Sequence, residues 1–200
     1  MKPYSLLPLA ALVAAAPQPS ADLALVQQHL QGLTTMTAAF SQTDRAGKVL
    51  TGTLTLKQPG RIRFQYQKGV PLLVVAEGGA LTVVDYQVKQ VQRWPIKSSP
   101  LGVLLDPKRD IGRYARVVDT GNARVVSLEA NDPKHPEYGR ITLVLARDAR
   151  GPAGLVLQGW VSLDSQGNRT TVRLSDQRFG GAIGDEAFRW NDPRRTGGHR

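Results

Sequence analysis

The stretch LTGTLTLKQPGRIRFQY, residues 50–66, decides the fold. Leucine and threonine alternate in its first half, and apolar residues alternate with arginine and glutamine after the turn at Pro59-Gly60. A period of two is the pattern of β-strands, whose successive side chains point to opposite faces. We therefore expect an antiparallel hairpin with one apolar face and one hydroxylated, basic face. The expected apolar side chains are those of Leu54, Leu56, Ile62, Phe64 and Tyr66.

The same alternation recurs along the rest of the chain, interrupted by turns rich in glycine, proline and aspartate. Strands are predicted near residues 36–40, 50–56, 62–66, 72–76, 81–86, 90–94, 114–118, 125–129, 141–146, 155–163 and 170–176. On the first of them, Met36 and Phe40 continue the apolar face. About eleven short strands predict a strongly curved antiparallel sheet or an incompletely closed barrel, mostly β within the α+β class.

Two segments depart from this alternation and are predicted to be short helices. They span residues 21–33 and 99–106, and each carries leucine or valine at the spacing of one helical face. Helices this short are marginal alone, so each apolar stripe must pack on the apolar face of the sheet as a cover. The stripes consist of Leu23, Val26 and Leu30 in the first segment and Leu101, Leu104 and Leu105 in the second.

Composition excludes several classes of protein. The chain has 200 residues, enough for one domain with its own core, and its 26 Lys and Arg against 16 Asp and Glu give a net charge of +10. The absence of cysteine excludes disulfides, thiol catalysis and lipidation of an N-terminal cysteine. The basic residues are dispersed, with few aromatic residues between them, which argues against nucleic acid as a partner and favours a solvated basic face.

The N-terminus predicts export. Lys2 precedes an apolar stretch over residues 6–16 that is too short to span a bilayer, and small residues with prolines follow it, as in a cleavable signal peptide. We divide the chain into a signal peptide over 1–21 with cleavage near 16 or 21, a single domain over 22–193 and a disordered basic tail over 194–200. The mature protein is expected in the periplasm as a monomer.

The residues that catalysis would require do not form a recognisable constellation in the sequence. Each of the three histidines, His29 among them, is expected on the solvated surface. Four aspartates lie at strand ends or turns, where aspartate commonly accepts hydrogen bonds from the backbone: Asp85, Asp106, Asp110 and Asp119. We therefore expect no enzyme activity, no cofactor and no metal. The apolar face is consistent with either a filled core or a ligand cavity.

Several motifs, taken in their order and spacing, resemble the periplasmic outer-membrane lipoprotein carrier family, LolA. They are F-S-Q at 40–42, G-x-L-x-L-K-x-P-G-R-I-R-F-Q-Y at 52–66, S-P-L-G-V-L-L at 99–105, D-x-x-G-N-x-T at 164–170 and F-R-W-N-D-P at 188–193. The resemblance covers residues 35 to 193. It implies an unclosed half-barrel of eleven antiparallel strands, with short helices forming a lid over an apolar cavity.

The resemblance also implies a function. Members of this family are chaperones that accept acylated lipoproteins from an ATP-driven release complex of the inner membrane, shield their acyl chains and pass them to an outer-membrane acceptor. The expected lipid cavity is then lined by Met36, Phe40, Leu54, Leu56, Ile62, Phe64 and Tyr66. The expected lid carries Leu101, Leu104, Leu105, Leu23, Val26 and Leu30.

The basic residues beside the proline turn at 59–60 are the expected contacts for partner transfer, namely Lys57, Arg61 and Arg63. Members often have arginine directly before this proline, where the present chain has Gln58. Two alternatives use the same half-barrel: a lipid-sensing regulator and a protein that binds a small hydrophobic ligand.

Overall fold

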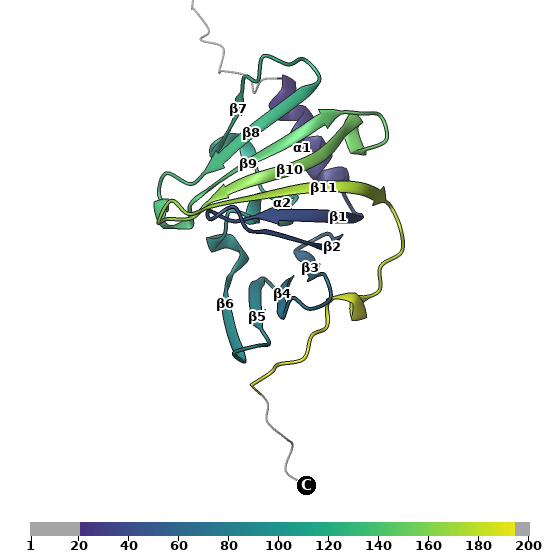
Figure 1. Cartoon of the computed structure of the whole chain (residues 1–200). Helices are drawn as coiled ribbons and strands as arrows, with labels where there is room; N and C mark the ends of the chain where they lie inside the picture. The colour runs from purple at the N-terminus through teal and green to yellow at the C-terminus, as the bar shows by residue number, and fades with distance from the viewer. Residues whose placement is uncertain (1–20, 195–200) are drawn as a thin grey trace, which may run out of the picture.

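The computed structural model describes residues 21–194, which form one eleven-stranded antiparallel sheet with two helices on one of its faces (Figure 1). The strands are β1 Thr35–Thr43, β2 Val49–Lys57, β3 Arg61–Tyr66, β4 Leu72–Glu77, β5 Ala80–Asp85, β6 Gln90–Pro95, β7 Ala115–Val118, β8 Val125–Asn131, β9 Arg140–Arg147, β10 Leu155–Leu163 and β11 Arg169–Phe179. Each of the eleven predicted strands overlaps one of them. The predicted signal peptide before Ala21 and the predicted tail after Arg194 lie outside the described residues.

The strand order explains why the barrel stays open. It runs β6-β5-β4-β3-β2-β1-β11-β10-β9-β8-β7, so the first and last strands pair at the centre of the sheet. The edge strands β6 and β7 do not pair with each other, and residues 96–114 connect them. The predicted unclosed, mostly β half-barrel is confirmed. We call the face that carries the two helices the concave face and the opposite one the convex face.

Aspartate side chains close two of the central hairpins. In the β1–β2 turn, Asp44 Oδ1 accepts hydrogen bonds from the backbone N–H groups of Ala46 and Lys48, at 2.8 and 3.0 Å. Asp164 repeats this arrangement in the β10–β11 turn. Each turn also contains a glycine with positive φ, a conformation that glycine adopts without steric cost. The two turns set the register of the strands that carry the central apolar face.

The first helix, α1 Ala21–Gly32, matches its prediction, whereas the second is shorter than predicted. α2 is the single turn Gly102–Leu105, not a helix over 99–106. Ser99 Oγ accepts a hydrogen bond from the Leu101 N–H within a local turn. At the other end, Asp106 leaves the helical conformation with φ −114° and ψ 87°, because the residue before a proline is sterically disfavoured in a helix.

Two apolar cores lie on opposite faces of the sheet. The main core fills the concave side between the sheet, α1 and α2. The smaller core lies on the convex side, where Leu73, Val75 and Val84 pack against Phe188 of the segment that follows β11. In Figure 1 this segment, drawn in yellow, runs past β3 and β4. Within residues 21–194, no helix is long and apolar enough to cross a membrane.

Candidate lipid-binding site

The seven predicted cavity residues share one surface, the concave face of β1, β2 and β3. Strand register places Met36 opposite Leu56, and Leu56 opposite Ile62. Leu54 in turn lies opposite Phe64. All seven side chains are buried, and the largest exposed fraction among them is 5%. The structure thus brings the predicted wall together as one continuous apolar surface.

An aromatic cluster forms the centre of this surface. The Phe40 ring lies edge-on to Phe64 and Tyr66, with centroid distances of 5.2 and 5.3 Å. Trp160 on β10 extends the cluster from the other half of the sheet, 6.0 Å from Phe64. The Tyr66 hydroxyl donates a hydrogen bond to Gln42 at 2.8 Å, and burial raises the pKa of Tyr66 to about 12. The surface is therefore apolar, with its one phenol satisfied and neutral.

Gly52 makes the close packing of these rings possible. It pairs with Phe40 on one side and with Tyr66 on the other. A Cβ atom at position 52 would lie 2.8 Å from Phe40 Cε1 and 2.1 Å from the Gln65 carbonyl oxygen, distances that no side chain tolerates. The glycine of the G-x-L-x-L motif is required by this contact.

Helix α1 covers the part of the concave face formed by β7, β8 and β10. Val26 and Leu30 of its predicted stripe are fully buried, and Leu23 is half-buried. In Figure 1 the helix lies behind β8, β9 and β10. The predicted role of this stripe as a cover agrees with its position.

The expectation that His29 lies on the solvated surface is wrong. Its side chain is fully buried, because α1 packs against the turn at residues 152–154. Nδ1 donates a hydrogen bond to the Pro152 carbonyl oxygen at 2.9 Å, and Nε2 has no hydrogen-bond partner among residues 21–194. Burial lowers the pKa of His29. The backbone at Pro152 and Leu155 acts to raise this pKa, but its effect is smaller.

The α2 segment packs into the main core on the concave face and is held at the β2–β3 turn. Leu104 and Leu105 are buried in the main core, and Leu101 is half-buried at its edge. The Gly60 N–H donates to the Leu105 carbonyl oxygen at 2.9 Å. The Gln58 side-chain amide donates to the Leu104 carbonyl oxygen. Gln58 thus contacts the lid directly, through a neutral hydrogen bond.

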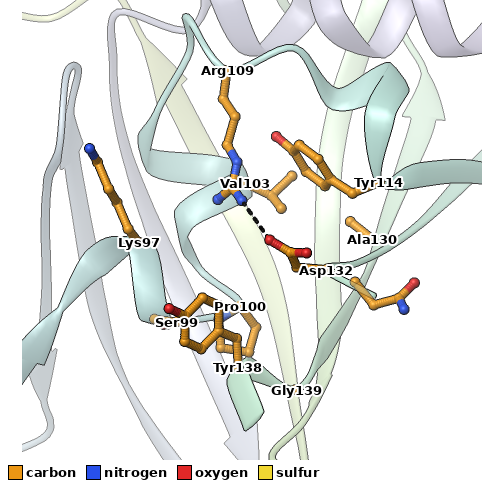
Figure 2. Close-up of a pocket in the computed structure, with 11 residues that line it drawn as sticks. Lys97, Ser99, Pro100, Val103, Arg109, Tyr114, Ala130, Asp132, Tyr138 and Gly139 are labelled. Atoms are coloured by element: carbon orange, nitrogen blue, oxygen red, sulfur yellow. Dashed lines mark ion pairs between the residues drawn. The ribbon is translucent and has the colours of Figure 1, made fainter. Parts of the chain in front are cut away.

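The loop that follows α2 is held at two further points. Gln27 of α1 accepts a hydrogen bond from the Ile111 N–H at 3.1 Å, which ties the two lid elements together. Arg109 stacks on the Tyr114 ring, 4.3 Å from its centroid, and forms an ion pair with Asp132 after β8 at 3.9 Å (Figure 2). Arg109, Tyr114 and Asp132 border a cavity of about 20 Å³, room for about one water molecule. Burial raises the pKa of Tyr114 to about 12.

A larger cleft opens at the edge of the lid. Its volume is about 340 Å³, and it lies between edge strand β6, the residues before α2 and the β10–β11 turn. Leu81, Trp94 and Leu101 form its apolar side, while Ser162 and Asp164 lie on the opposite rim. We call this cleft the mouth, because it leads from solvent to the half-buried edge of the lid.

Comparison with known proteins settles the family. The sequence model of the family described as outer membrane lipoprotein carrier protein LolA matches residues 31–191. The chain belongs to the LolA family. The outer-membrane lipoprotein carrier protein of Chromobacterium violaceum is 29% identical over 204 aligned residues, which cover 97% of this chain and 96% of that protein. Its counterpart in Dechloromonas aromatica is 27% identical, with coverage of 95% and 89%.

The fold is also similar to that of a solved structure. A conserved protein from Thermus thermophilus superimposes with a TM-score of 0.50 at 13% identity, and the match covers 86% of this chain and 94% of that one. At this identity the similarity shows that the two proteins share a fold. It agrees with the unclosed half-barrel of the LolA family.

In this LolA-family chain, the three basic residues predicted for partner transfer hold the C-terminal segment on the convex face. Asp185 forms ion pairs with Lys57 at 2.7 Å and with Arg61 at 2.5 Å. These two hydrogen bonds hold the pKa of Asp185 below its usual range. Arg63 donates to the Arg189 carbonyl oxygen at 2.8 Å. We call residues 180–194 the C-terminal strap.

Three of the four aspartates predicted at turns or strand ends in this LolA-family chain bind the backbone. Asp85, Asp110 and Asp119 each accept hydrogen bonds from backbone N–H groups two or three residues ahead, which confirms the predicted turn role for these three. In the described part of the chain, no group of three or more potential metal ligands comes together.

Sequence reasoning missed three residues of the site and its surroundings. His29 was expected on the solvated surface, Arg109 was given no role, and Phe188 was noted only as the first residue of the F-R-W-N-D-P motif. The sequence signal for the strap was the F-R-W-N-D-P motif at 188–193, which contains the aromatic residues Phe188 and Trp190. Arg109 carries no signal that distinguishes it from other loop arginines.

Proposed function

We propose that this lipoprotein carrier binds the acyl chains of its cargo on the concave face of β1, β2 and β3, after the α2 segment has moved away. The observation that carries the proposal is that sheet and lid share one apolar surface. The lid leucines pack on the apolar concave face of the strands. Acyl chains are saturated hydrocarbon like those leucine side chains, so they can pack on the same face. Lid and cargo would then compete for one site.

The energetics of burial support such a competition. Each methylene removed from water contributes about 0.8 kcal/mol, so exposed acyl chains are strongly driven into an apolar site. Displacing Leu104 and Leu105 exposes apolar surface again, and this cost offsets part of the gain. Release can therefore remain possible, which a carrier requires.

We infer the remaining parts of the function from family membership and from the N-terminal sequence. The carrier works in the periplasm as a monomer, without cofactor or catalytic step. It receives lipoproteins from an ATP-driven release complex of the inner membrane and delivers them to an outer-membrane acceptor where one is present. Residues 1–21 act as a cleaved signal peptide, and residues 22–193 form the single carrier domain.

Co-purification tests the proposal. The protein is exported in a bacterial host, purified from the periplasm and analysed by mass spectrometry for bound triacylated lipoprotein. Leu101→Glu places a charge at the mouth, beside the half-buried edge of the lid, without entering the fully buried core. We expect the wild-type protein to carry lipoprotein and the variant to carry at least several-fold less.

The matched control is Val88→Glu in the β5–β6 turn, where the valine is 64% exposed. It adds the same charge away from the mouth and should retain the cargo, and thermal unfolding shows that both variants fold. Equal loss of cargo in the two variants would refute the assignment of the mouth. A small hydrophobic molecule in place of lipoprotein would instead support a small-ligand-binding protein.

A further inference from the structure

The convex face of the central strands carries four arginines that the fold does not use. Arg140 lies on β9, and Arg169, Arg173 and Arg178 lie along β11. All four are exposed, and none forms a side-chain hydrogen bond or ion pair with another residue of the range 21–194. We call these four residues the arginine face.

Strand register shows that the four side chains share one face. Arg173 and Arg178 pair with Ser41 and Thr37 of β1, which alternate with the buried residues of the concave face. Leu163 of β10 pairs with Arg169 on one side and Arg140 on the other. Two strand spacings therefore separate Arg140 from Arg169, about 10 Å, and four residues separate Arg169 from Arg173, about 13 Å.

The positive charge of this face has little internal compensation. Asp176 on β11 forms no ion pair with the four arginines, and Glu129 on β8 is already paired with Arg116 at 2.7 Å. Lys57 and Arg61, farther along the convex face, are paired with Asp185 of the strap. The arginines of β9 and β11 are thus available to an external anion.

The residues around the arginines are mostly short. On β1 and β2 the convex side chains include Thr37, Ser41, Thr51 and Thr53, and Gly159 of β10 lies opposite Arg173. Two aliphatic side chains lie among them, Leu163 between Arg140 and Arg169 and Val161 on the same face, and both are half-buried. Exposed large anchors of the kind that dominate stable protein–protein interfaces are therefore few here. Short hydroxylated side chains let anionic groups approach the arginines closely.

We propose that the arginine face docks on the anionic headgroups of a phospholipid bilayer. β11 lies next to the centre of the eleven-stranded sheet, so its arginines lie along the crest of the convex face, the line along which a curved surface meets a flat one. In Figure 1 the convex side of β9, β10 and β11 is turned to the viewer, away from α1. Guanidinium groups bind phosphate in a bidentate manner. Contact on this side leaves α1 and the α2 segment free, because both lie on the concave face.

Vesicle co-sedimentation tests this contact. The probe is a vesicle of phosphatidylcholine with or without phosphatidylglycerol, at low and high salt, with protein purified from the periplasm. We expect binding that requires phosphatidylglycerol and decreases with salt. The triple variant Arg169→Gln, Arg173→Gln, Arg178→Gln should bind roughly 100-fold more weakly, since each arginine near an anionic surface contributes about fivefold, or about 1 kcal/mol. The single variant Arg173→Gln should lose about fivefold.

The control removes the same net charge elsewhere. Lys68, Lys89 and Lys134 are exposed in three different loops, and their simultaneous replacement by Gln should change vesicle binding by less than about threefold. Equal losses in the two triple variants would overturn the proposal in favour of a net-charge effect. Absence of wild-type binding at low salt would overturn it and leave an acidic protein as the partner.

Cargo binding distinguishes this inference from the proposed function. Binding that is insensitive to salt and to phosphatidylglycerol would assign vesicle contact to the concave apolar surface and overturn the proposal. The arginine variants should still co-purify with lipoprotein, because their side chains lie on the opposite face from the lid. Loss of cargo on Leu101→Glu and loss of vesicle binding on the arginine variant are separate results.

Discussion

At the scale of single residues, burial changes the chemistry of His29. A neutral imidazole that donates from Nδ1 to Pro152 fits between α1 and the turn at 152–154. A protonated ring would have a second N–H at Nε2, and that N–H would find no acceptor in its surroundings. A charged group buried without a partner is costly, so the fold favours the neutral ring.

This arrangement predicts how stability changes with pH. The pKa of His29 is lowered in the folded state, so the unfolded chain takes up the proton first as the pH falls below about 6.5. The free energy of unfolding should therefore decrease from about pH 6.5 downward until the folded state also binds the proton. The variant His29→Gln should lose less stability over this window in denaturant unfolding. Parallel pH curves for the two proteins would contradict the prediction.

At the scale of elements, the part of the predicted lid that contains α2 is the connection between the two open edges of the sheet. It runs from β6 to β7 and is held by separate contacts to the β2–β3 turn, to α1 and to Asp132. These contacts are single hydrogen bonds, one stacked arginine and one long ion pair. The buried leucines therefore contribute most of the energy that holds the α2 segment against the sheet.

Truncation of a lid leucine should affect stability and binding in opposite directions. Leu104→Ala removes a fully buried side chain and should lower the stability of the empty protein, by at most about 2–5 kcal/mol for a leucine of this burial. Its affinity for a hydrophobic fluorescent probe should rise, because less apolar contact must be broken before the probe enters. Denaturant midpoint and probe titration on the same variant check both effects.

A core leucine outside the lid serves as control. Leu73 is equally buried but lies on the convex side, beneath the strap. Leu73→Ala should lower stability without raising the affinity for the probe. If Leu104→Ala lost both stability and probe binding, the α2 segment would be an ordinary part of the core rather than a lid.

At the scale of the whole molecule, the C-terminal strap covers the convex side of β3, β4 and β5. Phe188 is fully buried against Leu73, Val75 and Val84, and Asp185 fixes the strap to β2 and β3. Because the strap follows the last strand of the sheet, it can detach while the sheet remains folded. Local opening of this kind is independent of the lid on the other face.

Phe188→Ala should therefore loosen the strap selectively. Hydrogen exchange is expected to accelerate over residues 181–192, while the β1–β11 pair at the centre of the sheet keeps its protection. The global loss of stability should stay below the roughly 3–5 kcal/mol typical of a buried phenylalanine in a cooperative core. Tyr86→Ala, at a tyrosine that is 37% exposed, is the control and should leave exchange unchanged. Uniform acceleration across the sheet would show that strap and sheet unfold together.

The eleven strands and the apolar face could be predicted from the sequence because they follow from local alternation. Alternation with a period of two predicts that residues such as Leu54 and Phe64 share one face. Glycine and aspartate predict the turns between the strands. The second helix was predicted too long, since helical spacing of leucines over 99–106 does not show that Asp106 must leave the helix before Pro107. The carrier function was predicted from the motifs that the chain shares with the LolA family.

The sequence by itself determined the strand pattern, the apolar surface and the family, because each depends on residues that are neighbours along the chain. Only the tertiary structure decided the burial of His29, the contact of Arg109 with Asp132 and the pairing of Lys57 with the strap. Those contacts join residues far apart in sequence, and polar side chains carry no periodic signal of their partners. Which polar groups become buried or paired is fixed only when elements far apart in the chain pack together.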